Sequence, residues 1–327
     1  MSGSSLLASV IIPAYNAAAT LPACLEALAK QTTPRSAYEI IVVDDGSNDA
    51  TARIAQDFSI RVVSQANAGA AAARNHGAWL ARAPILLFTD SDCAPAPDWI
   101  AQMLRPFEDP GVAGVKGVYG TRQREIVARF VQLEYEDRYD RMGEFNQIDF
   151  IDTYAAGYRR DIFLRMGGFA TIFPKASVED QEFSFRLARA GLRLVFAPQA
   201  RVYHLHDQTL AEYIRRKFWI GYWKVRVMRA YPDKLVSDSH TPQALKLQIG
   251  LAALSGLFII GSLFKPRLAV AGLLSWLLVG FSGLPFLRKI GRRDSKVALA
   301  APILLFVRAW ALGLGFLLGL FGYLSKR

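Results

Sequence analysis

Two aspartates stand one residue apart at the end of a hydrophobic run, in the stretch LLFTDSD over residues 86–92. Side chains two residues apart in an extended segment point to the same side, so Asp90 and Asp92 would share one side of the chain. Two carboxylates held close together repel each other unless a cation lies between them. Hard oxygen ligands suit Mg²⁺ or Mn²⁺, which usually keep coordination positions open for phosphate oxygens. The alternative is a turn in which two acids only keep the surface soluble.

Four hydrophobic runs indicate the elements that must position these aspartates. They cover residues 9–15, 38–47, 60–65 and 84–90, the second of them ending in a carboxylate pair and a glycine, and segments with helical spacing or alanine-rich composition lie between them. Strands that are hydrophobic throughout are typical of a parallel sheet with helices on both faces. We therefore predict an α/β domain with a doubly wound sheet.

The carboxyl ends of these runs carry most of the side chains that could bind a ligand. In open α/β sheets, ligands bind where strand ends meet the following loops. The residues at those positions are Tyr15, Asp44, Asp45, Asp90 and Asp92. Their coincidence at one expected edge of the sheet favours a ligand site over a solubilising turn.

The following half of the predicted domain supplies one more acidic motif. A helix is expected over residues 178–191, with acidic residues in its first turn and Gly191 at its end. Two strands are expected after it. The second of them carries His204 and His206 at strand spacing, and hence on one face.

Composition narrows the class of partner. The net charge is +11, from 39 basic and 28 acidic residues, and the basic residues cluster beside the hydrophobic segments after residue 200. That placement favours an anionic membrane surface over nucleic acid. Only Cys24 and Cys93 are present, which is no disulfide framework and fits a reducing cytosol. The N-terminus lacks the basic leader and long apolar run of a signal peptide.

Three apolar stretches close the chain, over residues 247–264, 268–287 and 297–324. Each is long enough to cross a bilayer. The loop 288–296 holds five basic residues, so the positive-inside rule puts it in the cytosol with the region before residue 247. Three crossings are expected, with the C-terminus outside. Arg308, the one charge within its segment, is expected to face protein, to snorkel, or to pair with a lipid phosphate.

Four motifs occur in order along the predicted strands: IIPAYN, VVDDGSND, NAGAAAARNHG and FTDSD. Together they resemble the family 2 glycosyltransferases, inverting enzymes that use nucleotide-sugar donors and have the GT-A fold, a Rossmann-like mixed sheet. The resemblance runs from about residue 9 to about residue 224. The ordered set is far more specific than any single motif.

The resemblance implies roles for the residues at the first two strand ends. Pro13 and Tyr15 would pack on the nucleobase. Asp44 or Asp45 would accept the N3–H of the base, which favours uracil. The alternatives are an ordinary aromatic at a strand end, and an aspartate that caps the helix starting near Asn48.

The resemblance also implies how the phosphates and the metal are held. Arg74 would contact the diphosphate, since a guanidinium is the natural partner of phosphate, with support from Asn67 and Gly69. Otherwise Arg74 is a surface arginine on an alanine-rich helix. Asp90 would face the ribose or sugar, and Asp92 would bind Mg²⁺ or Mn²⁺.

The pair Glu179-Asp180 matches an acidic pair of the same family. By resemblance Asp180 is the general base that deprotonates the acceptor hydroxyl, with Glu179 beside it in the substrate site. Both acids would also be stabilised at a helix N-terminus without any catalytic role. His204 would complete the metal site, although a lone histidine is often a hydrogen-bonded bystander. Ala156 and Gly157 would allow close approach in the sugar pocket.

Residues 211–231 mix six basic residues with two tryptophans, three tyrosines and a phenylalanine. This composition favours a helix at the membrane interface. The polymerising members of the family carry a Gln-x-x-Arg-Trp signature near this place. Here RRKFW keeps only Trp219, expected to bind substrate, so transfer of one sugar fits better than processive synthesis. The expected domains are a GT-A domain over 1–210, an interfacial segment over 211–246 and a membrane region over 247–327.

The sequence thus favours a multi-pass membrane protein whose catalytic domain lies on the cytoplasmic side. It would move one sugar from a nucleotide donor to a lipid-linked or glycan acceptor, and the base argument above favours UDP as the nucleotide. The alternatives are a processive polysaccharide synthase, a nucleotidyltransferase, and a non-catalytic nucleotide-sugar-binding scaffold in the membrane.

Overall fold

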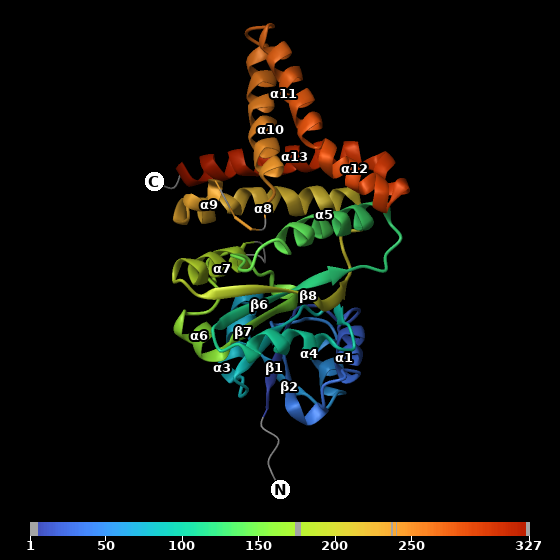
Figure 1. Ribbon diagram of the computed structural model, residues 1–327, viewed down its shortest axis with the longest axis vertical. Helices are drawn as coiled ribbons and strands as arrows, with labels where there is room; N and C mark the ends of the chain where they lie inside the picture. Colours follow the sequence, from blue (N-terminus) through green and yellow to red (C-terminus); the bar gives the residue numbers. More distant parts are fainter. Residues whose placement is uncertain (1–5, 174–177, 237, 240, 325–327) are drawn as a thin grey trace. The chain divides into compact units, whose positions relative to one another are not determined.

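The computed structural model describes residues 6–173, 178–236, 238–239 and 241–324. The chain divides into two compact units (Figure 1). The first comprises residues 1–122 and 141–205, and the second comprises residues 123–140 and 206–327. The domains predicted from sequence put 123–140 into the catalytic domain, whereas this segment clusters with the C-terminal helices. Its hydrophobic residues explain this, because Phe130 packs with residues of the C-terminal helices.

The first unit is built on one eight-stranded sheet in the order β3-β2-β1-β4-β7-β6-β8-β5. The strands β1 to β4 pair in parallel, while β7 runs antiparallel to both β4 and β6, and β5 antiparallel to β8. This confirms the predicted mixed, doubly wound sheet. The strands are β1 Ala8–Ala14, β2 Tyr38–Asp44, β3 Arg61–Ser64, β4 Ile85–Phe88, β5 Cys93–Pro95, β6 Val112–Gly120, β7 Ala156–Arg159 and β8 Arg193–His204.

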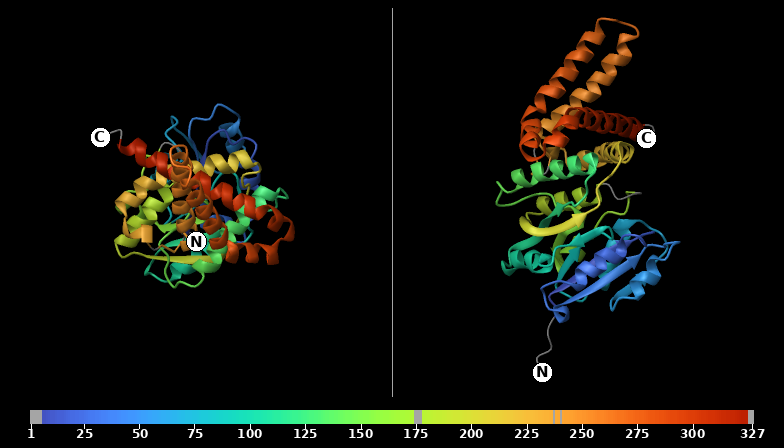
Figure 2. Two further views of the ribbon diagram at one scale, coloured as in Figure 1. Left: turned by 90° about the horizontal axis from the view of Figure 1, so that it is seen from above. Right: turned by 90° about the vertical axis from the view of Figure 1, so that its right-hand side faces the viewer.

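Helices cover both faces of this sheet, as Figure 2 shows from the side. They are α1 Leu21–Ala29, α2 Thr51–Gln56, α3 Ala70–Leu80, α4 Trp99–Leu104, α6 Arg160–Arg165 and α7 Glu179–Arg189, with short 3₁₀ turns at Arg35–Ala37, Arg105–Glu108 and Thr153–Ala155. The helix α3 lies very close to β1, because a Cβ at Gly77 would stand 2.5 Å from the Cγ2 of Ile11. Only glycine permits this approach, which fixes α3 above the strand ends.

Aromatic residues fill the core between the sheet and α7. The rings of Phe88, Tyr158, Phe163, Phe169 and Phe183 contact one another with centroids 5.0–6.3 Å apart, mostly edge to face. Edge-to-face contacts add to the free energy gained from burying these rings. The cluster therefore holds α7 and the adjacent loop firmly on the sheet.

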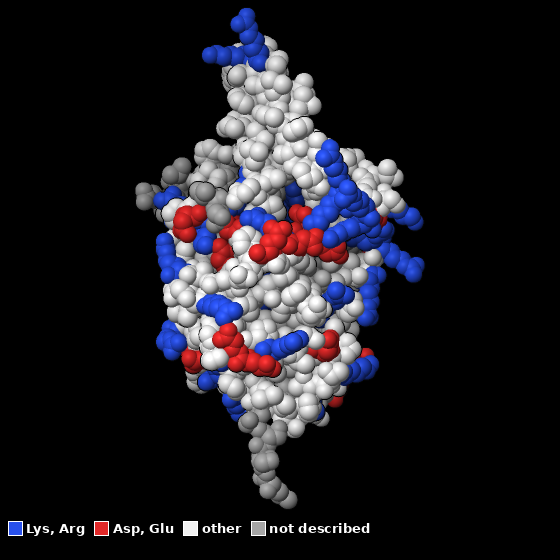
Figure 3. Space-filling view, viewed as in Figure 1, with Lys and Arg blue, Asp and Glu red and all other residues white. Residues whose placement is uncertain are grey.

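The second unit is helical. Its helices are α8 Leu210–Ala230, α9 Asp233–Val236, α10 Gln243–Ser262, α11 Leu268–Ser282, α12 Leu284–Arg293 and α13 Ser295–Leu324, together with most of α5, Ile126–Met142. Figures 1 and 2 show α10 and α11 as a hairpin that leans away from α8 and α13. In Figure 3 the sides of this hairpin are uncharged, with basic side chains at its tip and along α12.

Two described helices are long and apolar enough to cross a membrane, α10 and α13. The pair α11 and α12 is bent by 44° at its junction and is a third candidate if both helices form one span. Three spans were expected, over 247–264, 268–287 and 297–324. The helices agree with these segments, except that the second is broken at Gly283.

The helix α13 packs along α8 with direct backbone contact. A Cβ at Gly315 would stand 2.1 Å from the carbonyl oxygen of Phe218, and one at Gly319 would stand 2.5 Å from that of Tyr222. The stretch GFLLG at 315–319 is therefore a helix-packing motif, as its small residues at four-residue spacing predict. Half of the apolar window of α13 is buried inside the protein, compared with 22% for α10.

Arg308 on α13 is paired with protein. Its Nη1 donates to Glu134 of α5 at 2.9 Å, and its Nη2 donates to Gln248 of α10 at 2.7 Å. The residue is 6% exposed. The sequence analysis expected Arg308 to face protein, to snorkel or to pair with a lipid phosphate. In the structure it faces protein, because the buried carboxylate of Glu134 lies within hydrogen-bond distance.

Candidate active site

Asp90 and Asp92 lie in a turn between β4 and β5. The predicted strand was expected to continue to Asp90, but it ends at Phe88, and the backbone N–H of Cys93 donates back to the carbonyl of Asp90 at 3.0 Å. The argument that both carboxylates share one side of an extended segment is therefore wrong. The turn directs them to different partners.

Asp92 meets His204, which is the last residue of β8. The distance from Nε2 of His204 to Oδ2 of Asp92 is 3.3 Å. The strand register brings them together, because β5 and β8 are antiparallel with Cys93 opposite His204. Burial acts to raise the pKa of Asp92, but the hydrogen bond and charge of His204 outweigh it and lower that pKa. The lowered pKa favours the ionised carboxylate, which is the form that a cation would need.

Asp92, Cys93 and His204 together could hold a metal ion, since one ligand atom of each lies within 4.8 Å of the others. Burial, with the charges of Asp92 and Asp90, raises the pKa of the Cys93 thiol well above its usual value. A neutral thiol is a poor ligand for a hard cation. Carboxylate and imidazole suit Mn²⁺ in particular, so Asp92 and His204 fit the predicted metal and Cys93 does not.

The other histidine of the pair has a separate environment. His206 belongs to the second unit, where its Nε2 lies 3.0 Å from Oε1 of Gln132 and its ring stacks on Tyr135. The choice of His204 over His206 therefore agrees with the geometry at Asp92.

Arg74 joins the turn to α7. Its Nη2 donates to Asp90 at 2.7 Å and its Nη1 donates to Glu179 at 3.2 Å, and the residue is only 2% exposed. Arg74 is thus neither a surface arginine nor a freely accessible phosphate ligand in this state. Because Asp90 and Asp92 share one turn, contacts run continuously from His204 through the turn and Arg74 to Glu179.

Asp180 follows Glu179 in the first turn of α7. Burial, followed by the negative charges of Glu179 and Asp152, raises the pKa of Asp180 well above its ordinary value. Arg74 acts in the opposite direction but does not compensate. The expected role of these acids as mere helix-terminus residues does not explain such a pKa, because a helix N-terminus stabilises the charged form. Residues 174–177, just before them, lie outside the described residues.

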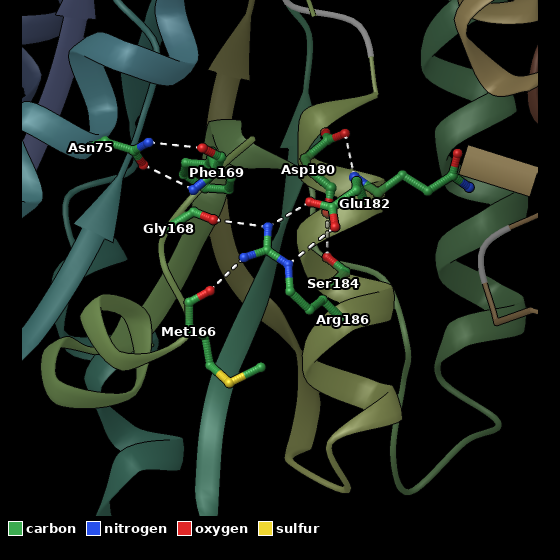
Figure 4. A network of polar contacts seen from close by, with 9 residues as sticks. Asn75, Met166, Gly168, Phe169, Asp180, Glu182, Ser184 and Arg186 are labelled. Atoms are coloured by element: carbon green, nitrogen blue, oxygen red, sulfur yellow. Dashed lines mark hydrogen bonds and ion pairs between the residues drawn. The ribbon is translucent and has the colours of Figure 1, made fainter. Parts of the chain in front are cut away.

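The helix α7 is tied to α3 through the loop at 166–169 (Figure 4). Arg186 of α7 donates to the carbonyl oxygens of Met166 and Gly168. Asn75, next to Arg74, exchanges two hydrogen bonds with the backbone of Phe169, at 2.8 and 2.9 Å. The sequence analysis did not predict these contacts. The hydrogen bonds of Asn75 join a side chain to the backbone of a residue about 90 positions away in the chain.

The expected nucleobase residues border the first strand ends. Tyr15 is 50% exposed just beyond Pro13 and β1, so its ring is available to a ligand. Asp45 already accepts the backbone N–H groups of Ala68 and Gly69, at 2.9 and 2.8 Å. The carboxylate of Asp44 accepts the backbone N–H of Ser47 at 3.2 Å, and no other hydrogen bond to it lies within the described part of the chain. Asp44 is therefore the better candidate for a base contact, and Asp45 shapes the loop.

Asn67 belongs to that same loop. Its Nδ2 donates to the carbonyl of Asp45 at 3.0 Å, and Gly69, directly before α3, has a φ of 91°. A positive φ of this size favours glycine. Both residues therefore build the loop that leads into Arg74, and their expected support of the diphosphate stays a prediction.

Comparison with known proteins shows which family the first part of the chain is similar to. Residues 9–167 match the family described as Glycosyl transferase family 2. This match covers 159 of the 327 residues, and the matched part of the chain is called the family 2 domain below. The chain is 29% identical to glycosyltransferase AglE of Haloferax volcanii, over 67% of this chain and 73% of that protein. It is 31% identical to validoxylamine A glucosyltransferase of Streptomyces hygroscopicus, over 59% of this chain and 54% of that protein.

Solved structures confirm the GT-A-like fold of the family 2 domain. The mannosyltransferase PcManGT from Pyrobaculum calidifontis, solved with GDP-Man and Mn²⁺, superposes with a TM-score of 0.58 at 19% identity. The superposition covers 96% of this chain and 86% of that one. GalNAc-T7 with UDP, GalNAc and Mn²⁺ gives a TM-score of 0.51 at 19% identity, over 74% of this chain and 53% of that one. At these identities the likeness concerns the fold.

Two expected pocket residues of the family 2 domain are central to its sheet. Ala156 and Gly157 begin β7 and pair with Phe88 and Leu87 of β4. A Cβ at Gly157 would meet Leu87, Met103 and Phe107, each at 3.1 Å. Glycine at this position therefore lets core side chains pack closely against the backbone. The sequence analysis had instead expected it to let the sugar approach closely.

The remaining expected residue, Trp219, lies on α8 in the second unit and is 41% exposed. Its ring contacts those of Phe218 and Tyr222. A substrate contact by Trp219 stays a prediction.

A buried ion pair of the family 2 domain escaped sequence reasoning. Lys116 on β6 is fully buried, pairs with Asp152 and donates to the hydroxyl of Tyr154 at 3.1 Å. Asp152 is one of the charges that raise the pKa of Asp180. The signal in the sequence was a lysine inside the otherwise uncharged strand GVAGVKGVYG, because a lysine is buried there only if an acid faces it.

Proposed function

We propose that this protein is a metal-dependent, inverting glycosyltransferase that moves one sugar from a nucleotide donor to a lipid-linked or glycan acceptor. One observation carries the proposal: the turn that carries Asp92, next to His204, also carries Asp90, which Arg74 links to Glu179 beside Asp180. These links support a candidate ion site and a candidate base within one site of the first unit. Such proximity is what a displacement between donor and acceptor needs.

Each residue has a defined task in the proposed reaction. Asp180, with its raised proton affinity, accepts the proton of the acceptor hydroxyl as that oxygen attacks the anomeric carbon. The attack opposite the leaving group inverts the configuration. Arg74 holds Asp90 and Glu179 in place and provides positive charge beside the leaving diphosphate. Asp92 and His204 would hold Mg²⁺ or Mn²⁺, which supplies positive charge that stabilises the leaving nucleoside diphosphate.

The donor base is proposed to be uracil, stacked on the exposed Tyr15 with Asp44 as hydrogen-bond acceptor. Because PcManGT was solved with GDP-Man and GalNAc-T7 with UDP, both classes of donor belong in the test. We expect the detergent-solubilised full chain to release UDP from a UDP-sugar in the presence of Mn²⁺ and membrane lipids. Release of GDP alone would overturn the uracil assignment but not the transfer.

The products separate the proposal from its rivals. A single-sugar increment on the acceptor supports it, whereas a ladder of long chains would support a processive synthase. Pyrophosphate in place of a nucleoside diphosphate would indicate a nucleotidyltransferase. If the protein binds the donor but forms no product under any condition, the result would support a non-catalytic scaffold that binds nucleotide-sugars.

Metal removal gives the sharpest test of the ion site. We expect EDTA to abolish nucleotide release and Mn²⁺ to restore it, and His204→Ala to weaken Mn²⁺ binding roughly 10- to 100-fold in calorimetry. Cys93→Ala is the matched control, because the buried neutral thiol should leave Mn²⁺ affinity within about twofold. Equal effects of the two variants would overturn the assignment of His204.

Membrane association is supported by the apolar helices, and the packing of α13 favours a particular arrangement. The helix α8, with six basic residues, belongs at the membrane surface, and α13 runs along it with backbone contact. The hairpin of α10 and α11 is then the inserted part, with α13 at the interface and the catalytic domain on the cytoplasmic side. A C-terminal tag should be labelled from the same side as the catalytic domain; labelling from the opposite side would instead support three crossings.

A further inference from the structure

The second unit contains a pocket of about 830 Å³ with a predominantly hydrophobic lining. The first turns of α8, the middle of α13 and one residue of α11 form its walls. The larger hydrophobic side chains of the lining include those of Ile214, Phe218, Trp276, Phe306, Trp310 and Leu314. Pockets of roughly 300–1,000 Å³ are the size in which proteins hold small molecules.

Aromatic rings make up one wall of this pocket. The centroid of Trp276 lies 4.7 Å from that of Phe306 and 5.5 Å from that of Trp310, on which it stacks. Ile214 and Leu314 are 39% and 44% exposed at the pocket. Hydrocarbon surface of this extent gains free energy when another apolar group covers it. The pocket therefore suits a flexible hydrocarbon chain.

Arg215 is the charged residue of the lining. Within the described part of the chain, its guanidinium has no hydrogen-bond or ion-pair partner in the second unit. The nearby Glu212 is already engaged, because its Oε2 accepts the backbone N–H groups of Gln208 and Thr209, at 2.9 and 3.0 Å. A guanidinium next to an apolar pocket matches a ligand that joins a hydrocarbon chain to a phosphate.

We propose that this pocket holds the hydrocarbon chain of the acceptor lipid and that Arg215 pairs with the phosphate of that lipid. This inference rests on the proposed function. The pocket lies where the α10–α11 hairpin meets α8 and α13, which is head-group depth in the membrane arrangement proposed above. The helix α8 begins only five residues after β8, the strand that ends at His204. The helix that lines the proposed lipid pocket thus follows, in the sequence, the strand that carries the candidate metal ligand His204.

The tryptophans in the wall provide a direct measurement of binding. Hexadecyl phosphate with a brominated chain, added to the detergent-solubilised full chain, should quench part of the tryptophan fluorescence. The quenching should disappear in the variant Trp276→Phe/Trp310→Phe, although the other tryptophans remain. Arg215→Ala should weaken binding roughly tenfold, the size of one lost charged hydrogen bond. Arg226→Ala, which removes an exposed arginine of the same helix, should leave the affinity within about twofold.

Three results would overturn the proposal. The first is equal affinity for brominated hexadecanol and hexadecyl phosphate, since Arg215 would then recognise nothing. The second is quenching that persists without Trp276 and Trp310, because the lipid would then lie elsewhere. The third is binding of brominated phosphatidylglycerol as tight as that of brominated hexadecyl phosphate, because the pocket would then bind ordinary bilayer lipids.

Transfer assays on the same variants distinguish this proposal from the proposed function. If hexadecyl phosphate binds as described but no donor yields a glycosylated lipid, the function is wrong and the pocket stands. If lipid products form at the same rate in Arg215→Ala and in Leu314→Glu as in the unaltered chain, the function stands and the pocket assignment is wrong.

Discussion

Replacing Asp180 with asparagine is expected to lower the rate of sugar transfer by roughly 10²- to 10⁴-fold and, at neutral pH, to raise the melting temperature. The first effect follows because an amide cannot accept the proton of the acceptor hydroxyl. The second follows from the pKa of Asp180, which burial and the charges of Glu179 and Asp152 hold well above its ordinary value. The folded protein then binds this proton more tightly than the unfolded chain does.

The pH dependence of this effect has a definite sign. Between the ordinary pKa of an aspartate and the raised value in the folded protein, stability falls as pH rises, because the fold must accommodate a charge that it disfavours. Asp180→Asn removes that cost. The melting temperatures of the two proteins should therefore be similar at low pH and separate as pH increases, which differential scanning fluorimetry across a pH series measures.

A surface aspartate provides the control for this experiment. Asp161 is exposed and pairs with Arg165 one turn later, so Asp161→Asn should change neither transfer rate nor melting temperature appreciably. Two results would contradict the assignment of Asp180. One is an asparagine variant with nearly unaltered transfer, and the other is a loss of stability that grows as pH rises.

Glu134→Gln should reduce the free energy of unfolding by about 3–5 kcal/mol, the cost of removing one partner from a buried ion pair. Glu134 is 3% exposed on α5, where it pairs with Arg308 of α13 and Lys217 of α8, each at 2.9 Å. The amide leaves two buried cations without a counter-charge. Denaturant or thermal unfolding of the solubilised full chain measures the loss.

Glu136→Gln is the matched control, because it removes a carboxylate from the same helix at a surface pair. The ion pair of Glu136 with Arg293 is 36% exposed on both sides, so its loss should cost about 0–1 kcal/mol. Similar losses in both variants would show that the Glu134 cluster contributes no more than an exposed pair.

The Glu134 cluster also predicts an acid dependence. Burial acts to raise the pKa of Glu134, but Lys217 and Arg308 outweigh it and lower that pKa to about 2. Because the folded pKa is depressed, this stabilisation is present above the ordinary pKa of 4.5 and is lost as pH falls toward 2. The difference between Glu134→Gln and the unaltered chain should therefore shrink in that range.

Local sequence patterns determined the α/β class, the strand positions and the apolar C-terminal helices. These features depend on hydrophobic periodicity and on turn residues, which neighbouring positions of the chain specify. The ordered motifs also identified residues that the fold brings together, such as Asp92 with His204. The ends of the parallel strands β1 and β2, near Tyr15 and Asp44, meet at one edge of the sheet regardless of loop detail. The antiparallel pairing of β5 with β8 that joins Asp92 to His204 did not follow from the sequence pattern.

Tertiary structure alone decided which partner each charged group has. Arg74 lies between Asp90 and Glu179, Lys116 meets Asp152, and Arg308 meets Glu134 rather than a lipid. Only the tertiary structure showed that residues 123–140 belong to the helical unit and that α13 packs along α8. The physical reason is that an ion pair or a helix contact depends on where distant segments meet, to within a few tenths of an ångström. No pattern along the chain encodes that distance.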